Sequence, residues 1–217
     1  MKVVMQNKTS SPATESAPAK GVSLSKGERT HANLRRHAAA EFARLGYHNT
    51  KVSDIVKATG VSQPTFYCYF ESKEMAYEDL MTEFRSRLET LTLTFLIEGE
   101  AHAEEVFDRV ALSFQQLLDF LAEDPDLTQI GFFQPPGCTA TKAGLAELIG
   151  QNIAKEQKNG LYRKDISATQ MGQCFVGMLD QMARIPGDAQ KRKELSLGCA
   201  TLLCEDIRSG CQPENKR

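Results

Sequence analysis

Two short helical stretches separated by a tight turn constrain this chain more than any other feature. The first covers positions 52–59, Gly60 follows it directly, and the second covers positions 63–70. Ser62 precedes the second stretch, where a serine hydroxyl can accept a hydrogen bond from a main-chain N–H of the first turn. Glycine tolerates the left-handed conformation in which helices end. The pattern over about 52–71 therefore predicts a helix-turn-helix.

A longer helix precedes this pair. Ser25 and Glu28 have the spacing of a capping box, and apolar residues then recur at helical intervals as far as Leu45. Gly46 follows as a natural end of that helix. We expect Thr50 to cap the first of the two short helices.

The rest of the chain has helical spacing throughout. Ser72 or Glu71 can cap a long helix that starts at Lys73 and runs to about Leu96. Further helical segments, interrupted by Pro135-Pro136-Gly137 and Pro186-Gly187, cover 101–122, 124–133, 143–158, 167–184 and 188–209. No segment alternates as a strand would, so the sequence predicts an all-α fold.

Composition limits the classes of protein to which the chain can belong. Hydrophobic residues make up 41% and charged residues 25%, as in ordinary globular proteins. No apolar run approaches the roughly 18 residues of a membrane span, and the N-terminus lacks the apolar core of a secretory signal. We therefore expect a cytoplasmic protein with no membrane partner. Residues 1–24, rich in small and polar side chains, predict a flexible tail.

The chain shows no arrangement typical of an enzyme or a metal centre. None of its six cysteines forms a CxxC pair, and His102 is the one histidine beyond His48, so we expect no metal site. The sequence has no nucleophile elbow, P-loop or dinucleotide fingerprint. We expect neither catalytic residues nor a cofactor.

The charge of the chain is divided unevenly. Residues 1–70 carry 10 Lys and Arg against 4 Asp and Glu, a net charge of +6. Residues 71–217 carry 16 against 24, a net charge of −8, and the two sum to the −2 of the whole chain. A basic N-terminal third predicts contact with a polyanion.

One face of the second short helix carries side chains that can read a DNA major groove. Gln63 can bond to an adenine edge, and the Pro64 ring or the Thr65 methyl can touch a thymine methyl. Tyrosine and serine hydroxyls can bond to phosphates. Lys73, at the start of the next helix, adds an ammonium group to the positive end of the helix dipole.

The stretch from His31 to Leu80 resembles the DNA-binding domain of the tetracycline-repressor (TetR) family. The resemblance is carried by Ala39, Phe42, Gly46, Tyr47, Thr50, Val52, Asp54, Ile55, Gly60, Val61, Ser62, Thr65, Tyr67, Tyr69, Phe70, Ser72 and Lys73. The chain departs from the family pattern at Val56, Thr59, Pro64 and Cys68, and the last two leave open which operator is read.

The resemblance implies an all-α protein of about nine helices. A three-helix DNA-binding domain over 25–72 would precede a domain over 73–217 that dimerises and binds a small-molecule inducer. Most members of the family are repressors that this inducer releases from a palindromic double-stranded DNA operator. By family position, the DNA-contact candidates are Ser62, Gln63, Pro64, Thr65, Tyr67, Tyr69 and Lys73, with Thr50 and Ser53 as weaker ones.

Two further sets of residues are candidates in the C-terminal domain. Aromatic and methionine side chains can line a ligand pocket: Phe95, Phe114, Phe132, Phe133, Met171, Phe175, Met178 and Met182. The resemblance implies a homodimer formed by the last two helices. An apolar stripe on the last helix would contribute Leu195, Cys199, Leu202, Leu203 and Ile207.

Two other interpretations stay open at this point. Cys68 lies on the expected DNA face, so its oxidation could provide a redox signal in place of a ligand. Alternatively, the helical domain could belong to a carrier or enzyme for an apolar small molecule, with the N-terminal helices retained as a relic. Such a carrier would lack salt-dependent affinity for DNA.

Overall fold

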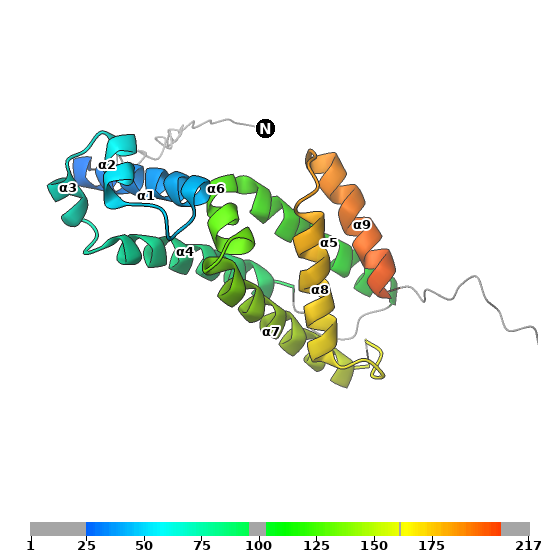
Figure 1. Cartoon of the computed structure of the whole chain (residues 1–217). Coiled ribbons are helices and arrows are strands. Elements are labelled where there is room, and N and C mark those ends of the chain that lie inside the picture. Colours follow the sequence, from blue (N-terminus) through cyan, green and yellow to red (C-terminus); the bar gives the residue numbers. More distant parts are fainter. Residues whose placement is uncertain (1–24, 96–102, 161, 205–217) are drawn as a thin grey trace, which may run out of the picture.

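In the computed structural model, the residues that are described, 25–95, 103–160 and 162–204, form helices and connecting turns with no strand. The predicted tail over 1–24 lies outside them. Three helices come first: α1 (Lys26–Leu45), α2 (Val52–Thr59) and α3 (Gln63–Tyr67). As Figure 1 shows, these lie together at one end of the molecule, and α4 (Lys73–Leu93) leads away from them into the larger body.

The helix starts follow the predicted caps at three of four places. The Ser25 hydroxyl oxygen accepts a hydrogen bond from the Glu28 N–H, and the Glu28 carboxylate accepts one from the Ser25 N–H. The Ser62 and Ser72 hydroxyl oxygens accept from the Thr65 and Met75 N–H groups and cap α3 and α4, without the reciprocal bond. Thr50 does not cap α2, because Lys51 stands at that position and the Asp54 carboxylate accepts its N–H.

The larger body contains α5 (Ala103–Glu123), α6 (Pro125–Thr128), α7 (Gly137–Lys158), α8 (Ala168–Met182) and α9 (Ala189–Cys204). A π-helical turn, η1 (Gln129–Phe133), continues α6. Helix α7 packs along α8, and α5 packs along α9. Figure 1 shows α8 crossing the body, with α9 beside α5. No helix of the described residues is long and apolar enough to cross a membrane.

Helix α7 begins earlier than predicted, at Gly137 instead of Ala143. Its first N–H group donates to the hydroxyl oxygen of Tyr77 on α4, at 3.0 Å, and the Tyr77 hydroxyl donates to the Ile130 carbonyl of η1. A side chain 60 residues away thus satisfies a helix start that the local sequence leaves open. Helix α3 is shorter than predicted and ends at Tyr67, three residues before Phe70.

One continuous core joins the two parts of the molecule. Phe42 of α1, Ile55 of α2 and Phe66 of α3 are fully buried at the narrow end. Helix α1 also packs against α4 and α6. The three N-terminal helices therefore rest on the body through α1, and α3 is left at the periphery.

Candidate nucleic-acid interface and internal cavity

The turn between α2 and α3 has the geometry of a helix-turn-helix. Gly60 ends α2 in the left-handed region, with φ 75° and ψ 16°, and its N–H donates to the Val56 carbonyl at 2.9 Å. The Ser62 hydroxyl oxygen then accepts from the Thr65 N–H at 3.3 Å, and the two side-chain hydroxyl oxygens lie 2.8 Å apart. These bonds fix the start of α3 relative to α2.

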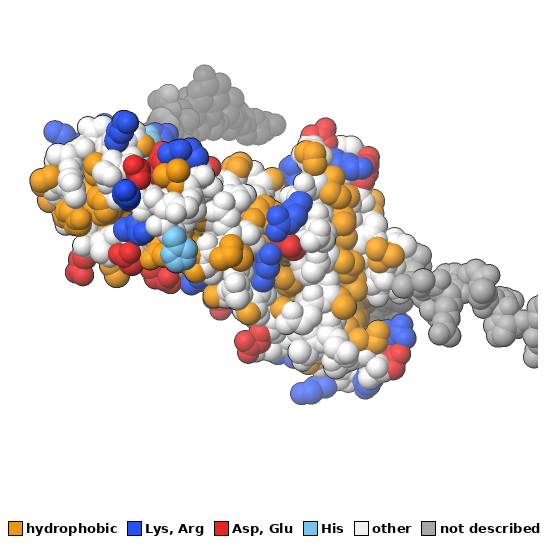
Figure 2. Space-filling model, viewed as in Figure 1, with side chains coloured by type: hydrophobic (Ala, Val, Ile, Leu, Met, Phe, Trp, Pro, Cys, Tyr) orange, Lys and Arg blue, Asp and Glu red, His pale blue; other side chains and the backbone are white. Residues whose placement is uncertain are grey.

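Helix α3 is anchored on one side and open on the other. Phe66 and the following Phe70 are 0% and 6% exposed. Gln63, Pro64, Tyr67 and Cys68 line a shallow hollow on the opposite side, and Tyr67 is 49% exposed — the predicted reading face. In Figure 2, hydrophobic side chains gather at this end of the molecule, with Lys and Arg side chains nearby.

Lys73 is held at the start of α4. Its Nζ donates to the Tyr47 carbonyl at 3.0 Å and lies 4.6 Å from the centre of the Tyr47 ring. The Tyr47 hydroxyl donates to Glu74, and its pKa is raised by burial and by the negative charge of that carboxylate. The half-buried ammonium group therefore fixes the N-terminus of α4 to the turn after α1, beside α3.

Tyr69 lies beside the reading face and is half-buried. Its ring stacks on His31 of α1, with ring centres 5.5 Å apart and planes at 15°. Sequence reasoning did not single out His31 as a support for this tyrosine. The position of His31 on α1 gives no sign of this contact, because Tyr69 lies 38 residues further along the chain.

The two weaker DNA-contact candidates differ sharply. Ser53 is exposed in the first turn of α2. Thr50 is 1% exposed, and its hydroxyl donates to the carbonyl of Gly46 at 2.9 Å, with the Glu41 carbonyl at 3.2 Å. The Thr50 side chain therefore bonds within the domain and offers no surface to DNA, contrary to expectation.

A small cavity of about 50 Å³ lies inside the larger body. Three of the predicted ligand residues line it: Phe95, Met171 and Phe175. Phe114 lies behind them, fully buried and stacked on Phe175 with ring centres 3.9 Å apart. The other candidates do not line it: Phe132 and Phe133 belong to η1, and Met178 and Met182 are partly buried on α8.

Sequence reasoning missed the polar side of this cavity. Asn152 and Glu156 are 7% and 4% exposed, and both line it together with Tyr162. Burial, and then the negative charge of Glu156, raises the Tyr162 pKa well above its ordinary value. The sequence did contain a sign of these residues, because the cavity-facing positions of α7 recur at helical spacing and mix polar with apolar side chains. These positions are Ile149, Asn152, Ile153 and Glu156.

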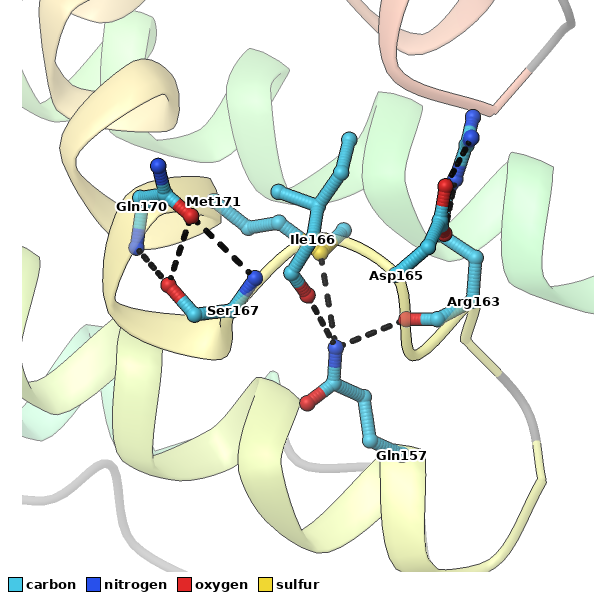
Figure 3. A network of polar contacts seen from close by, with 7 residues as sticks. All are labelled: Gln157, Arg163, Asp165, Ile166, Ser167, Gln170 and Met171. Atoms are coloured by element: carbon cyan, nitrogen blue, oxygen red, sulfur yellow. Dashed lines mark hydrogen bonds and ion pairs between the residues drawn. The ribbon is translucent and has the colours of Figure 1, made fainter.

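The connection between α7 and α8 is held by one amide group (Figure 3). The Gln157 Nε2 donates to the carbonyls of Arg163 and Ile166, at 2.7 and 2.9 Å, and lies 3.8 Å from the Met171 sulfur. Beyond it, Ser167 caps α8 through a capping box with Gln170. The network therefore fixes the segment that brings Tyr162 and Met171 to the cavity.

The predicted dimer stripe divides between two faces of α9. Cys199 is 3% exposed and belongs to the core of this chain, so it offers no surface to a second copy. Leu195 and Leu203 also pack against the core, and Leu203 lines the cavity. Leu202 is 60% exposed, and Ile207 lies outside the described residues.

No cluster of His, Cys, Asp or Glu able to hold a metal ion occurs in the part of the chain that the structure describes. The geometry thus consists of an anchored helix with an open polar and aromatic face, and a cavity in a separate helical body.

Comparison with known proteins agrees with this geometry. The family model of the bacterial regulatory proteins of the tetR family matches residues 34–77, from within α1 to within α4. The chain is 40% identical over 158 residues to YdgC of Bacillus subtilis (strain 168), an uncharacterized HTH-type transcriptional regulator. That alignment covers 73% of this chain and 81% of YdgC.

Solved structures share the fold at lower identity. FadR of Bacillus subtilis in complex with stearoyl-CoA has a TM-score of 0.59 and 21% identity, and the match covers 81% of this chain and 98% of FadR. AibR in complex with isovaleryl coenzyme A and operator DNA has a TM-score of 0.60 and 14% identity, over 80% and 97% of the two chains. The chain belongs to the TetR family and is a DNA-binding transcriptional regulator.

Proposed function

We propose that this regulator reads its operator with the outer face of α3. The carrying observation is that Gln63, Pro64, Tyr67 and Cys68 stand together on the open side of a helix that fully buried Phe66 anchors on the other side. Direct reading of bases requires side chains that project from a rigid element into the major groove. Ser53, Ser62, Thr65, Tyr69 and Lys73 surround this face and would position it on phosphates.

The regulator acts as a homodimer formed by α8 and α9, as the family resemblance implies. Two recognition helices can contact successive major grooves when a twofold axis places them about 34 Å apart. The outward side of α9 carries the exposed side chains of Leu197 and Leu202. Gly177 and Gly198, where an added Cβ would meet nothing within 4 Å, leave room there for a second copy.

Ligand binding in the cavity releases the protein from DNA, so the protein represses. A cavity of about 50 Å³ is small for an organic ligand, so binding must displace its walls and shift the molecule toward another state. The cavity wall includes Phe175 of α8, and the same helix carries Asp180, which pairs with Lys142 at 2.8 Å and with Arg184 at 3.0 Å. The crystallised relatives hold acyl-CoA ligands, which supports ligand control in this chain.

The two cations of that cluster connect α8 to η1. The Lys142 Nζ lies 5.1 Å from the centre of the Phe132 ring, and the Arg184 guanidinium lies 4.3 Å from the centre of the Phe133 ring. Residue Gln134, directly after η1, bonds to α1. Movement of α8 therefore has a continuous contact route to the DNA-binding helices.

Residues 25–72 form the DNA-binding domain in this proposal, and residues 73–217 form the domain that binds the ligand and the partner subunit. The protein functions in the cytoplasm as a regulator and not as an enzyme or a carrier. Ligand control is preferred to redox control, because the cavity provides a ligand site, whereas exposed Cys68 stands alone in the reading face.

The dimer is tested by sedimentation of the full chain carrying Leu202→Glu. A carboxylate on an apolar contact face disfavours association, so we expect monomers and loss of operator binding. Leu112→Glu is the control, since Leu112 is exposed to 50% on α5. If the Leu202 variant sediments as the wild type does, α9 is not the dimer face.

A further inference from the structure

Arg35 of α1 holds two carboxylates of α4. Its Nε lies 2.9 Å from the Asp79 Oδ2, and its Nη2 contacts the Glu83 Oε2. The Arg35 Nε and the Asp79 Oδ2 are buried, and neither forms a hydrogen bond with any residue that the structure describes, so each depends on this ion contact. Asp79 and Glu83 stand one helical turn apart and would repel each other without the cation between them.

Helix α1 joins this ion contact to the DNA-reading end of the molecule. His31 lies one helical turn before Arg35, and its ring stacks on Tyr69, directly after α3. The same ring lies 5.2 Å from the centre of the Phe70 ring. One turn of α1 therefore contacts the segment that ends α3, and the next turn contacts α4. Because a helix is rigid over such a short distance, the position of α3 follows the direction of α1.

The part of α4 that receives the guanidinium is fixed to the larger body. The Tyr77 hydroxyl bonds to the first N–H of α7 at 3.0 Å. Two turns later, the Arg85 Nε donates to the Thr141 hydroxyl oxygen of α7 at 3.3 Å. Asp79 and Glu83 lie between these two attachments, so their position is that of the body.

Two polar contacts then fix the direction of α1 on the body. The Gln134 amide bonds to the Ala43 carbonyl, and Ala43 lies about 12 Å along α1 from Arg35. With that bond alone α1 could pivot, since packed helices can slide by small amounts. The helix extends about 18 Å from Ala43 to His31, so a pivot of about 10° moves the α3 end by about 3 Å. This is roughly the rise of one base pair.

We propose that Arg35 is a positioning residue that sets which spacing of operator half-sites the dimer accepts. A charge-assisted contact has a preferred geometry, whereas apolar burial has none. Arg35 therefore selects one direction of α1, and the twofold axis repeats it in the second subunit. The inference rests on the proposed dimer and on the proposed reading of bases by α3. It adds the residue that fixes the distance between the two reading faces.

A series of duplexes that differ in the distance between half-sites tests the proposal. Each carries two copies of the wild-type half-site, with the spacer changed by up to about three base pairs, and every base pair shifts the second copy by about 3.4 Å and turns it by about 35°. We expect the wild-type dimer to prefer one spacing at least about tenfold over its neighbours, and Arg35→Met to reduce this ratio below about threefold. Partial unfolding weakens binding to all spacings alike, so the ratio of affinities reports on position and not on stability.

Two further variants sharpen the test. Arg44→Met is the matched control on the same helix, because Arg44 pairs with Glu41 within α1. It should keep the wild-type preference. Glu83→Lys places an ammonium group beside the Arg35 guanidinium and should reduce the preference as Arg35→Met does. The Glu83 side chain is 43% exposed, so this variant decides the matter even where Arg35→Met does not fold.

An unchanged preference in a folded Arg35→Met or Glu83→Lys dimer, or an equal loss in Arg44→Met, would overturn the inference. Failure of the proposed function has a different signature. If α3 does not read DNA, or if the protein does not dimerise, the wild type itself shows no preference for paired half-sites. If only the role of Arg35 is wrong, the wild type and the variants share one preferred spacing.

Discussion

Gln134 donates a hydrogen bond from its side-chain amide to the main-chain carbonyl of Ala43, at 3.0 Å and across 91 positions of the chain. Ala43 lies near the end of α1, and Gln134 follows η1 directly. The bond therefore joins the helix that supports α3 to the body that contains the cavity.

Gln134→Leu should loosen this junction. Loss of one partly buried hydrogen bond costs about 1 kcal/mol of unfolding free energy, and main-chain amides near the end of α1 should exchange with solvent faster. Urea denaturation and hydrogen exchange measure the two effects. Gln151→Leu is the control, since Gln151 is exposed and bonds to Glu147 within α7. Equal changes in unfolding free energy and amide exchange in the two variants would contradict the role of Gln134 in joining α1 to the body.

Thr50→Val should destabilise the DNA-binding domain by about 1–2 kcal/mol. Valine matches the shape of threonine but leaves the Gly46 and Glu41 carbonyls without the hydroxyl that they share. The comparison is Thr90→Val, which removes a hydroxyl bonded to Ser86 on an exposed helix face. The urea midpoint should fall clearly for the buried site and little for the exposed one; the reverse order would contradict the structural role of Thr50.

Thr50 also shows where sequence reasoning fails. A threonine two residues before a helix can serve as a cap, as a phosphate contact or as a buried link, and spacing alone does not decide among them. By contrast, the serine caps and the glycine ends depend on neighbours in sequence, so Ser25, Ser62, Ser72 and Gly60 were predicted correctly.

The cavity could be predicted only in part for a related reason. Phe95, Met171 and Phe175 are large apolar residues and were therefore natural candidates. Asn152 and Glu156 line a cavity because α5, α8 and α9 close around them. The start of α7 likewise depends on the Tyr77 hydroxyl from α4. Local periodicity places Asn152 and Glu156 on one stripe of α7, but contacts between helices distant in sequence decide that this stripe faces a cavity.

Gly172→Ala should destabilise the contact between α7 and α8 by about 1–3 kcal/mol. A Cβ at this position would lie 2.5 Å from the Ala146 carbonyl oxygen, and main chain cannot move aside as a flexible side chain does. Gly144→Ala places a methyl group where nothing lies within 4 Å and should gain up to about 1 kcal/mol through helix propensity. Thermal unfolding of both variants should shift in opposite directions, and shifts of the same sign would contradict this packing.

Tyr162 should make the protein sensitive to alkaline pH. Burial raises its pKa above the ordinary value of 10.0, so the unfolded chain loses the phenolic proton first. Stability from this group is complete below about pH 10 and falls as the pH rises further. Tyr162→Phe should show a smaller fall in unfolding free energy from pH 9 to 11, measured by urea titration. An unchanged pH profile would show that the phenol is not buried in solution.

The central claim, that the outer face of α3 reads DNA, is tested by selecting binding sites from a random duplex pool at near-physiological salt. The wild-type protein should recover a palindrome, with affinity that falls steeply as salt rises. Tyr67→Ala should lose that sequence, and Leu112→Ala, at a side chain equally exposed on α5, should keep it. Recovery of the same palindrome by the Tyr67 variant at equal affinity, or failure of the folded wild-type dimer to enrich any sequence, would contradict the claim.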